Sequence, residues 1–162
     1  MSLESVRAFL AARAPDITII DQGESTATVA DAARTLGVAP GQIAKTLSVR
    51  INDQVVLIVA RGDARLDNRK TKATFGGRPR MLDADEVFER TGHRVGGVCP
   101  FGLATSIPVY CDHSLKDFAE VYPAAGSTTS SVRLTPDRLA DLTDATWVDV
   151  CQPAAMTAEA AE

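Results

Sequence analysis

The chain has 162 residues, of which 45% are hydrophobic and 23% charged, and this is typical of one globular domain with a real core. Its net charge of −4 by itself disfavours a nucleic-acid partner, and its longest apolar run, VVLIVA at 55–60, is too short to span a bilayer. An N-terminus without the apolar segment of a signal peptide, and three widely spaced cysteines, argue against secretion and a disulfide framework; we expect a cytoplasmic protein without a membrane partner.

The N-terminal half of the chain predicts two helices and a β-hairpin. The predicted elements are a helix over roughly 3–13, a strand over 17–20, a helix that ends at Leu36, and strands over 45–51 and 55–60. Thr26 or Thr28 can cap the second helix at its start, and Gly37 can end it. The letters NDQ between the two long strands predict a hairpin turn.

The C-terminal half predicts three further helices among short strands. The predicted helices lie near 67–75, over 84–91 and from Pro136 through Leu142, and the predicted strands near 107–111, 119–123, 130–134 and 146–150. This order does not match simple βαβ units. We therefore predict an α/β (α+β) fold with a mixed, curved, barrel-like sheet and flanking helices, not a doubly wound one. Residues 1–152 are expected to form a single domain and 153–162 a flexible tail.

Lys45 interrupts an apolar strand face. Successive strand residues point to opposite faces, so Lys45 shares its face with Ile43, Leu47, Val49 and Ile51, while the even positions of the strand have the pattern of a solvated face. Two interpretations remain open at this point. The lysine either packs its stem on the core and reaches water with its ammonium group, or it projects into a cavity where a cation has a function.

A basic segment stands out on this acidic chain. Residues 61–80 carry a net charge of +5, from Arg61, Arg65, Arg69, Lys70, Lys72, Arg78 and Arg80 against Asp63 and Asp67. One interpretation is a solvated helix face, because charge clusters are common on surfaces. The other is a patch that contacts phosphates, with Arg65, Arg69, Lys70 and Lys72 as the candidate residues.

The stretch GHRVGGVCPFGL at 92–103 contains four glycines and one proline, and cannot be a regular helix or strand. Glycine permits close backbone approach to a ligand and leaves N–H and C=O groups free to bind it. A plain connecting loop is the alternative. The stretch has neither the Walker pattern nor G-x-G-x-x-G.

Five segments follow one another in a distinctive order: QIAKTL, LIVARGDARLD, RTGHRVGGVCPFGL, IPVYCDHSLKDFAEVYPAAGS and VRLTPDRLADLT. Together they resemble the YbaK/EbsC family of aminoacyl-tRNA deacylases, which includes the editing domain inserted in bacterial prolyl-tRNA synthetases. The resemblance covers roughly residues 25–150. It implies the fold of the YbaK/prolyl-tRNA synthetase-associated domain, a mixed α/β domain around a curved sheet.

The resemblance also implies site residues. The family's lysine corresponds to Lys45, and its G-x-x-x-P loop to residues 96–100. The implied catalytic set is Lys45, Gly96, Gly97 and Pro100. The implied substrate-binding set is Val98, Cys99, Ala125, Gly126 and Ser127. Lys45 is expected either to anchor the phosphate of the terminal nucleotide or to stabilise negative charge on the ester oxygen.

The implied activity is hydrolysis of the ester between a wrong amino acid and the tRNA 3′ end, without a metal or cofactor. The expected substrate is proline tRNA carrying a small amino acid such as cysteine or alanine, and prolyl-tRNA synthetase is a candidate partner; no DNA partner is expected. The hydroxyl-rich letters GSTTSS at 126–131 depart from the family versions that are specific for cysteine. A non-catalytic tRNA-binding accessory or regulatory protein of the same fold is the alternative.

Two other chemistries can be written on the same residues. Cys99, His93 or His113, and Asp112 could form a cysteine hydrolase, although the spacing fixes no geometry and a cysteine is more often a small buried hydrophobe. A zinc site from the three cysteines and two histidines is a weaker alternative, because none of them forms the C-x₂₋₄-C pairs of structural zinc sites.

Overall fold

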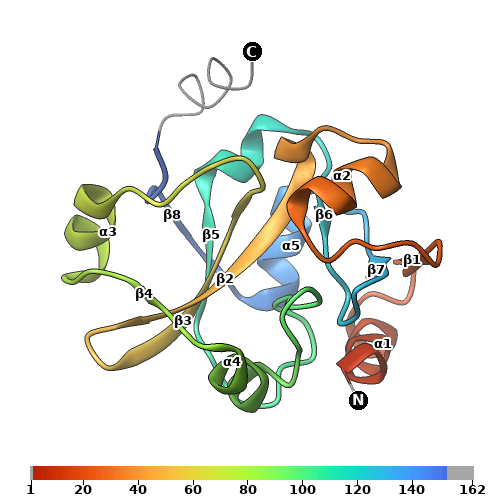
Figure 1. Ribbon diagram of the computed structural model, residues 1–162, viewed down its shortest axis with the longest axis horizontal. Coiled ribbons are helices and arrows are strands. Elements are labelled where there is room, and N and C mark those ends of the chain that lie inside the picture. Colours follow the sequence, from red (N-terminus) through yellow and green to blue (C-terminus); the bar gives the residue numbers. More distant parts are fainter. Residues whose placement is uncertain (1, 153–162) are drawn as a thin grey trace.

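The computed structural model describes residues 2–152, and its centre is an open mixed β-sheet (Figure 1). The strands run in the order β4 (Arg80–Met81), β2 (Ile43–Ile51), β3 (Gln54–Arg61), β5 (Val109–Asp112) and β8 (Thr146–Val148), with β6 (Tyr122–Pro123) also paired to β2. β1 (Ile20–Asp21) and β7 (Ser130–Ser131) form a separate antiparallel pair. β4 and β8 are the two ends of this order, so the sheet formed by the described residues does not close into a barrel.

Helices surround this sheet (Figure 1). They are α1 (Ser2–Arg13), α2 (Val29–Leu36), α3 (Asn68–Phe75), α4 (Ala84–Thr91) and α5 (Pro136–Thr143), with short 3₁₀ turns η1 (Pro40–Gln42) and η2 (His113–Asp117). The side chains of Thr28, Asp67, Asp83 and Thr135 each accept a hydrogen bond from a first-turn amide, so local capping chemistry fixes the starts of α2 to α5. The five predicted helices are confirmed.

The short strands differ more from the prediction. The first predicted strand, 17–20, is shifted to Ile20–Asp21, and the predicted strands over 119–123 and 130–134 shorten to β6 and β7. The hairpin turn is one residue tighter than predicted, because Asn52 and Asp53 both adopt positive φ and Gln54 already belongs to β3. β4 was not predicted, since two exposed residues carry no periodic signal.

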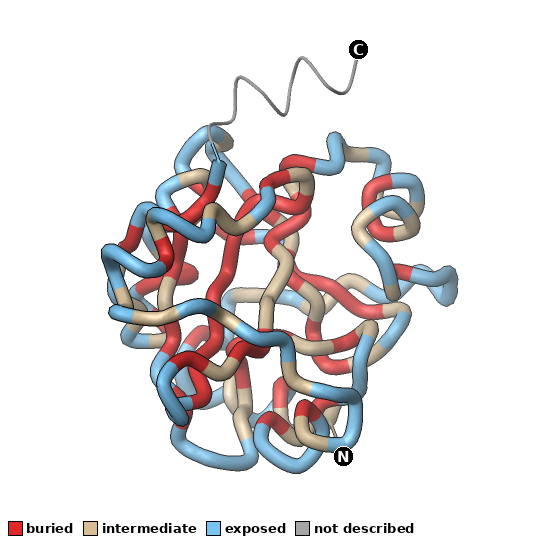
Figure 2. The backbone as a smooth tube through the Cα atoms, turned by 60° about the vertical axis from the view of Figure 1, so that its left-hand side comes forward, coloured by how far each residue is buried: buried red, intermediate tan, exposed pale blue. Residues whose placement is uncertain are grey.

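The two faces of the sheet bury different clusters. Leu57, Val59 and Cys111 pack with α1 and α5 on one face, in the main core. On the other face Val49, Val56 and Ile58 pack against Phe75 of α3. The tube view shows buried backbone along the central strands and exposed backbone around them (Figure 2). The sheet is therefore covered on both sides, as expected for a mixed sheet flanked by helices.

The prediction of a solvated even face on β2 was wrong. Ala44 and Ser48 are 2% and 4% exposed, and Arg50 forms an ion pair with Glu86 of α4. The reason is tertiary: α4, the segment before α2 and the glycine-rich loop lie against this face, as the lining of the cavity described below shows. Residues 153–162, predicted to be a flexible tail, lie outside the described residues.

Candidate functional site

A gap along one edge of β2 creates a cavity. On this edge β6 pairs with Ile43 and Ala44, and β4 pairs with Val49 and Arg50. The Ser48 carbonyl accepts a hydrogen bond from the Leu82 amide at 3.1 Å. Backbone groups of every second residue face this edge, so the N–H and C=O of Thr46 point into the gap between the two short strands. Main-chain groups are therefore presented to whatever occupies it.

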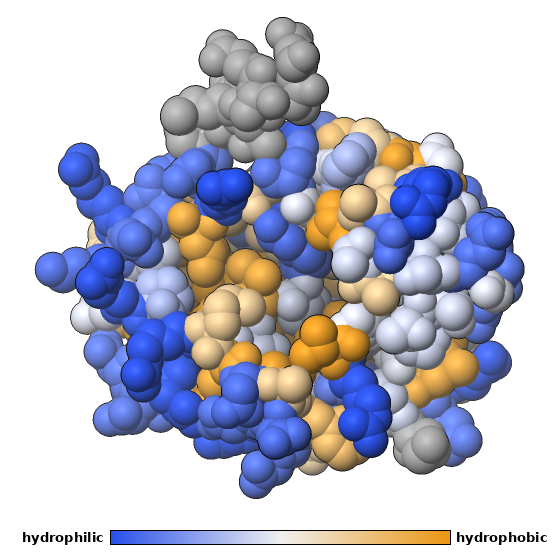
Figure 3. Space-filling view, in the orientation of Figure 1, coloured by the Kyte–Doolittle hydropathy of each residue, from blue (hydrophilic) through white to orange (hydrophobic). Residues whose placement is uncertain are grey.

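The cavity in this gap has a volume of about 300 Å³. That volume lies at the lower end of the range for small-molecule sites. Its walls come from the segment before α2, from β2, from α4 and from the glycine-rich loop; they include Thr26, Val29, Ala44, Lys45, Thr46, Ser48, Leu82, Val87, Gly96, Val98, Tyr122 and Ala124. In the space-filling view, hydrophobic atoms surround a hollow near the centre of the face over β2 (Figure 3). Met81 and Val95, both 63% exposed, also line it and leave apolar surface at the site.

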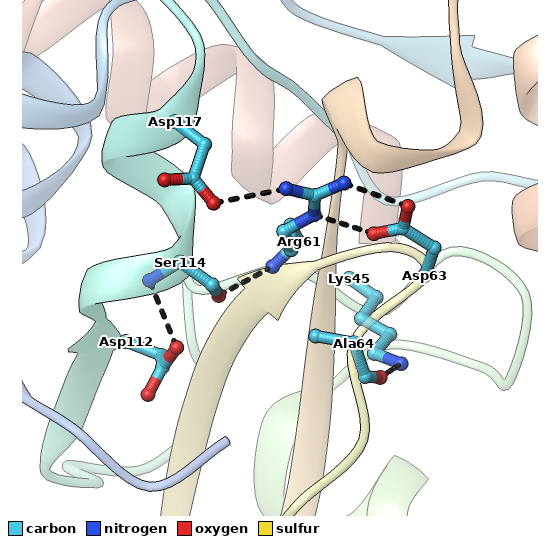
Figure 4. Close-up of polar contacts among 7 residues, drawn as sticks. All are labelled: Lys45, Arg61, Asp63, Ala64, Asp112, Ser114 and Asp117. Carbon is cyan, nitrogen blue, oxygen red and sulfur yellow. Dashed lines mark hydrogen bonds and ion pairs between the residues drawn. The ribbon is translucent and has the colours of Figure 1, made fainter. Parts of the chain in front are cut away.

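Lys45 is the one charged residue lining this cavity among the residues that the structure describes. Its ammonium group donates a hydrogen bond to the main-chain carbonyl of Ala64, in the turn after β3 (Figure 4). One of the three N–H donors of the ammonium group is therefore paired within the protein, and the other two are available to a ligand. Lys45 is also only partly exposed, so its ammonium group is partly desolvated where it meets the Ala64 carbonyl.

Burial lowers the pKa of Lys45, and the nearby positive charge of Arg65 acts in the same direction. The negative charge of Asp63 opposes this effect and favours the ammonium form. A partly desolvated ammonium group interacts more strongly with developing negative charge than one in water does. The site can therefore stabilise an anion, either a phosphate or an oxyanion.

An ion-pair network fixes the turn that holds Lys45. Arg61 is buried and binds Asp63 through two contacts, Nε to Oδ1 at 2.5 Å and Nη2 to Oδ2 at 2.8 Å, and it binds Asp117 at 2.9 Å (Figure 4). The Arg61 carbonyl also accepts from the Ala64 amide at 3.1 Å. Arg61 thus belongs to the structure beneath the site and is not part of the exposed basic surface.

The glycine-rich loop reaches the cavity through Gly96 and Val98. Gly96 has φ of +97°, a conformation that other residues rarely adopt. Gly97 lies against the backbone of the following segment: a Cβ at this position would be 2.8 Å from the Ser127 nitrogen. The Gly126 amide also donates to the Gly97 carbonyl at 3.1 Å, so the two segments are joined where only glycine fits.

The structure divides the predicted site residues into three groups. Lys45, Gly96 and Val98 line the cavity at the edge of β2. Gly97, Gly126 and Ser127 line a separate cavity of about 560 Å³ beside α4 and the start of α1. Cys99, Pro100 and Ala125 are buried, and Pro100 borders a third cavity next to α1.

Sequence reasoning did not assign Thr26, Thr46 and Ser48 to the cavity, where they are three of the hydroxyl-bearing residues in the wall; Thr28, Tyr122 and Ser131 also line it. Thr46 and Ser48 are even positions of the strand that contains Lys45, and they were read as solvated. Their polar character in a buried strand was the available signal, but the covering segments come from distant parts of the sequence.

Cys99 and His93 form a buried contact beneath the glycine-rich loop. The His93 Nε2 donates to the Phe101 carbonyl at 2.7 Å, which leaves Nδ1 to accept from the Ser2 hydroxyl of α1. The Cys99 sulfur lies 3.6 Å from Nε2 and has no exposed surface. Burial raises the pKa of Cys99 to about 12, and it lowers the pKa of His93. This arrangement fastens the loop to α1 and disfavours a thiolate.

We expect the Cys99→Ser protein to keep most of its hydrolytic activity, because the side chain is buried and its thiol stays protonated. Cys111→Ser, at another fully buried thiol, is the matched control for the cost in stability, which thermal unfolding measures. Complete loss of turnover in a folded Cys99→Ser protein, or capture of a covalent acyl-enzyme by mass spectrometry, would instead establish a cysteine hydrolase.

The basic segment lies on and around α3. Arg65, Arg69 and Lys72 are exposed, whereas Lys70 binds Asp149 at 2.9 Å. Arg65 follows Ala64, whose carbonyl accepts the hydrogen bond from Lys45, so this surface begins next to the Lys45 ammonium group. In Figure 3 the surface over α3 and β4 is hydrophilic and extends towards the hollow.

The three cysteines are buried and free, and the residues within 2–152 contain no cluster of three or more His, Cys, Asp or Glu side chains suited to a metal ion. None of the helices in this described part combines the length and apolar character that a membrane crossing requires.

The profile of the aminoacyl-tRNA editing domain matches residues 23–142 of this chain. The chain is 49% identical over 154 residues to the uncharacterized protein YwhH of Bacillus subtilis (strain 168), across 94% of this chain and 98% of that protein. It is 31% identical over 134 residues to the proline–tRNA ligase of Halalkalibacterium halodurans, across 82% of this chain but 23% of the ligase.

A solved structure agrees with these sequence matches. The crystal structure of a candidate trans-editing enzyme for prolyl tRNA synthetase superimposes with a TM-score of 0.85 at 33% identity. This match covers 94% of this chain and 98% of the other. The similarity therefore extends over nearly the whole of both chains, as it does for YwhH, whereas the ligase is matched over a segment.

Proposed function

Because the chain belongs to the aminoacyl-tRNA editing domain family, we propose that it is a trans-editing hydrolase that deacylates mischarged aminoacyl-tRNA. The proposed substrate is proline tRNA that carries a small wrong amino acid, of the size of cysteine or alanine. The relatedness to proline–tRNA ligases and to a candidate trans-editing enzyme for prolyl tRNA synthetase supports this choice of tRNA.

The cavity at the edge of β2 is the observation that carries the proposal. It has about 300 Å³ of space, Lys45 is the one cation among the described residues that line it, and its apolar rim at Met81 and Val95 could contact the terminal adenosine. A cavity of this size accommodates a small aminoacyl group. The bulk of the tRNA would remain outside, over the surface that includes Arg65, Arg69, Lys70 and Lys72.

The reaction we propose is addition of water to the ester carbonyl. A tetrahedral intermediate with a negatively charged oxygen forms, and the 3′ oxygen of the terminal adenosine then leaves with a proton. Lys45 would stabilise that oxygen or hold the phosphate of the terminal nucleotide. Gly96 and its loop would position the ester and the water, together with the edge-facing groups of Thr46. An aminoacyl ester is already activated, so orientation and electrostatics can suffice.

The test is a deacylation assay with purified protein on proline tRNA charged with cysteine, alanine, serine, threonine and, as the cognate control, proline. We expect release of at least one small wrong amino acid with multiple turnovers and little release of proline. Adding prolyl-tRNA synthetase would show whether a partner accelerates the reaction. Tight binding of these tRNAs with no release from any of them would contradict the proposal and support a non-catalytic accessory protein.

A further inference from the structure

Three buried hydroxyl oxygens of the described residues have no hydrogen-bond partner, and all three belong to the walls of the cavity at the edge of β2. They are the side-chain oxygens of Thr26, Thr46 and Ser48. Thr26 and Ser48 are 6% and 4% exposed. Buried side-chain hydroxyls are nearly always paired, so three unpaired ones around one cavity indicate a polar group that belongs there.

These residues cannot easily turn away to find other partners. The Thr26 amide donates to the Thr128 carbonyl at 2.7 Å, and the Ser48 carbonyl accepts from the Leu82 amide at 3.1 Å. Thr46 lies between Ala44 and Ser48 in the β2–β3 ladder, opposite Val59. The backbone of each residue is fixed, so its hydroxyl can move only by rotation about χ1 before a ligand arrives.

We propose that Thr26, Thr46 and Ser48 make the cavity selective for an amino acid that carries a hydroxyl group, serine or threonine, on the mischarged tRNA. This inference rests on the proposed deacylase function and names its substrate class. A substrate hydroxyl is both donor and acceptor, so it can pair with more than one of the wall hydroxyls at once. Apolar wall residues such as Val29, Leu82 and Val87 limit the size of the group.

The same chemistry explains how the cognate ester would be spared. The ring of proline has no hydroxyl, so a prolyl group in this cavity would leave the three wall oxygens unpaired after it had displaced water from them. The methyl group of alanine fails for the same reason, and a thiol is only a weak hydrogen-bonding group. Sites that pair a substrate hydroxyl discriminate strongly against analogues that lack it.

The experiment compares kcat/KM for seryl-, threonyl-, alanyl- and prolyl-tRNA in the wild-type protein and in the double variant Thr46→Val, Ser48→Ala. In the wild type we expect seryl or threonyl release to exceed alanyl release at least about tenfold. In the double variant this ratio should fall at least about tenfold, because seryl and threonyl release slow more than alanyl release does. Both substitutions replace unpaired hydroxyls by apolar groups, so folding is expected to survive.

Thr143→Val is the matched control, because the Thr143 hydroxyl bonds the Leu139 carbonyl within α5 at 2.8 Å and does not line the cavity. The ratio of its kcat/KM for seryl-tRNA to its kcat/KM for alanyl-tRNA should equal that of the wild type. Equal losses on all substrates in the double variant would mean that the hydroxyls bind a part common to every aminoacyl ester, which overturns the inference and leaves the deacylase function standing. An unchanged ratio also overturns it. Absence of release from every substrate by the wild type would overturn both proposals.

Discussion

The Lys45→Ala protein is expected to deacylate its substrate at least about a hundredfold more slowly than the wild type while keeping its fold. Lys45 is the one charged residue on the cavity wall within the described part of the chain, and the wall offers no other cation to replace it. A hundredfold loss corresponds to about 2.7 kcal/mol of transition-state stabilisation, a reasonable contribution for a partly desolvated charge. Single-turnover rates at saturating enzyme measure the chemical step directly.

Lys45→Met is the matched control, because methionine keeps an apolar stem of similar length and removes the ammonium group. If the charge matters, both variants are slow and both unfold near the wild-type temperature. If only the packing of the Lys45 stem matters, methionine should restore activity and alanine should not. Near-normal turnover by a folded Lys45→Ala protein would remove Lys45 from the site altogether.

The parts of the fold that local chemistry determines were predictable from the sequence. Thr28 and Asp83 cap the N-termini of α2 and α4, and Gly37 and Gly92 cap their C-termini. Each cap bonds amides or carbonyls within a few residues of itself, so the signal is local in the sequence. The two-residue strands were not predictable, since β6 and β7 exist only where distant segments pair with them. Their lengths follow from tertiary contacts and not from periodicity.

The candidate site was predictable to a similar degree. Lys45 and Gly96 line one cavity, whereas Gly126 and Ser127 line another, and the roles that the resemblance implies for them stay predictions. The hydroxyls of Thr46 and Ser48 were assigned to a solvated face. The alternation within the strand carries no information about α4 and the glycine-rich loop, which cover this face. A pattern gives the period of a strand, whereas burial depends on what packs against each side.

The second large effect concerns the exposed cations beside the cavity. The triple variant Arg65→Gln, Arg69→Gln, Lys72→Gln is expected to bind aminoacyl-tRNA at least about tenfold more weakly at low salt. Each lost phosphate contact should also reduce the slope of log affinity against log salt by about one unit. Lys70 should contribute less, because its ammonium group is already paired with Asp149. Filter binding or anisotropy at several salt concentrations measures both quantities.

A matched triple variant on other surfaces, Arg7→Gln, Lys116→Gln, Arg133→Gln, removes the same charge from exposed positions outside the basic segment. It should change affinity and salt slope little, because phosphate contacts depend on where the charge lies and not on the total. A short aminoacyl-adenosine ester should react equally well with the wild type and with both triple variants, since the cavity and Lys45 are intact. Equal loss on tRNA and on the short ester would assign Arg65, Arg69 and Lys72 to the support of the cavity. No loss on either would make the basic segment a solvated surface, and the tRNA would then have to lie over another face of the protein.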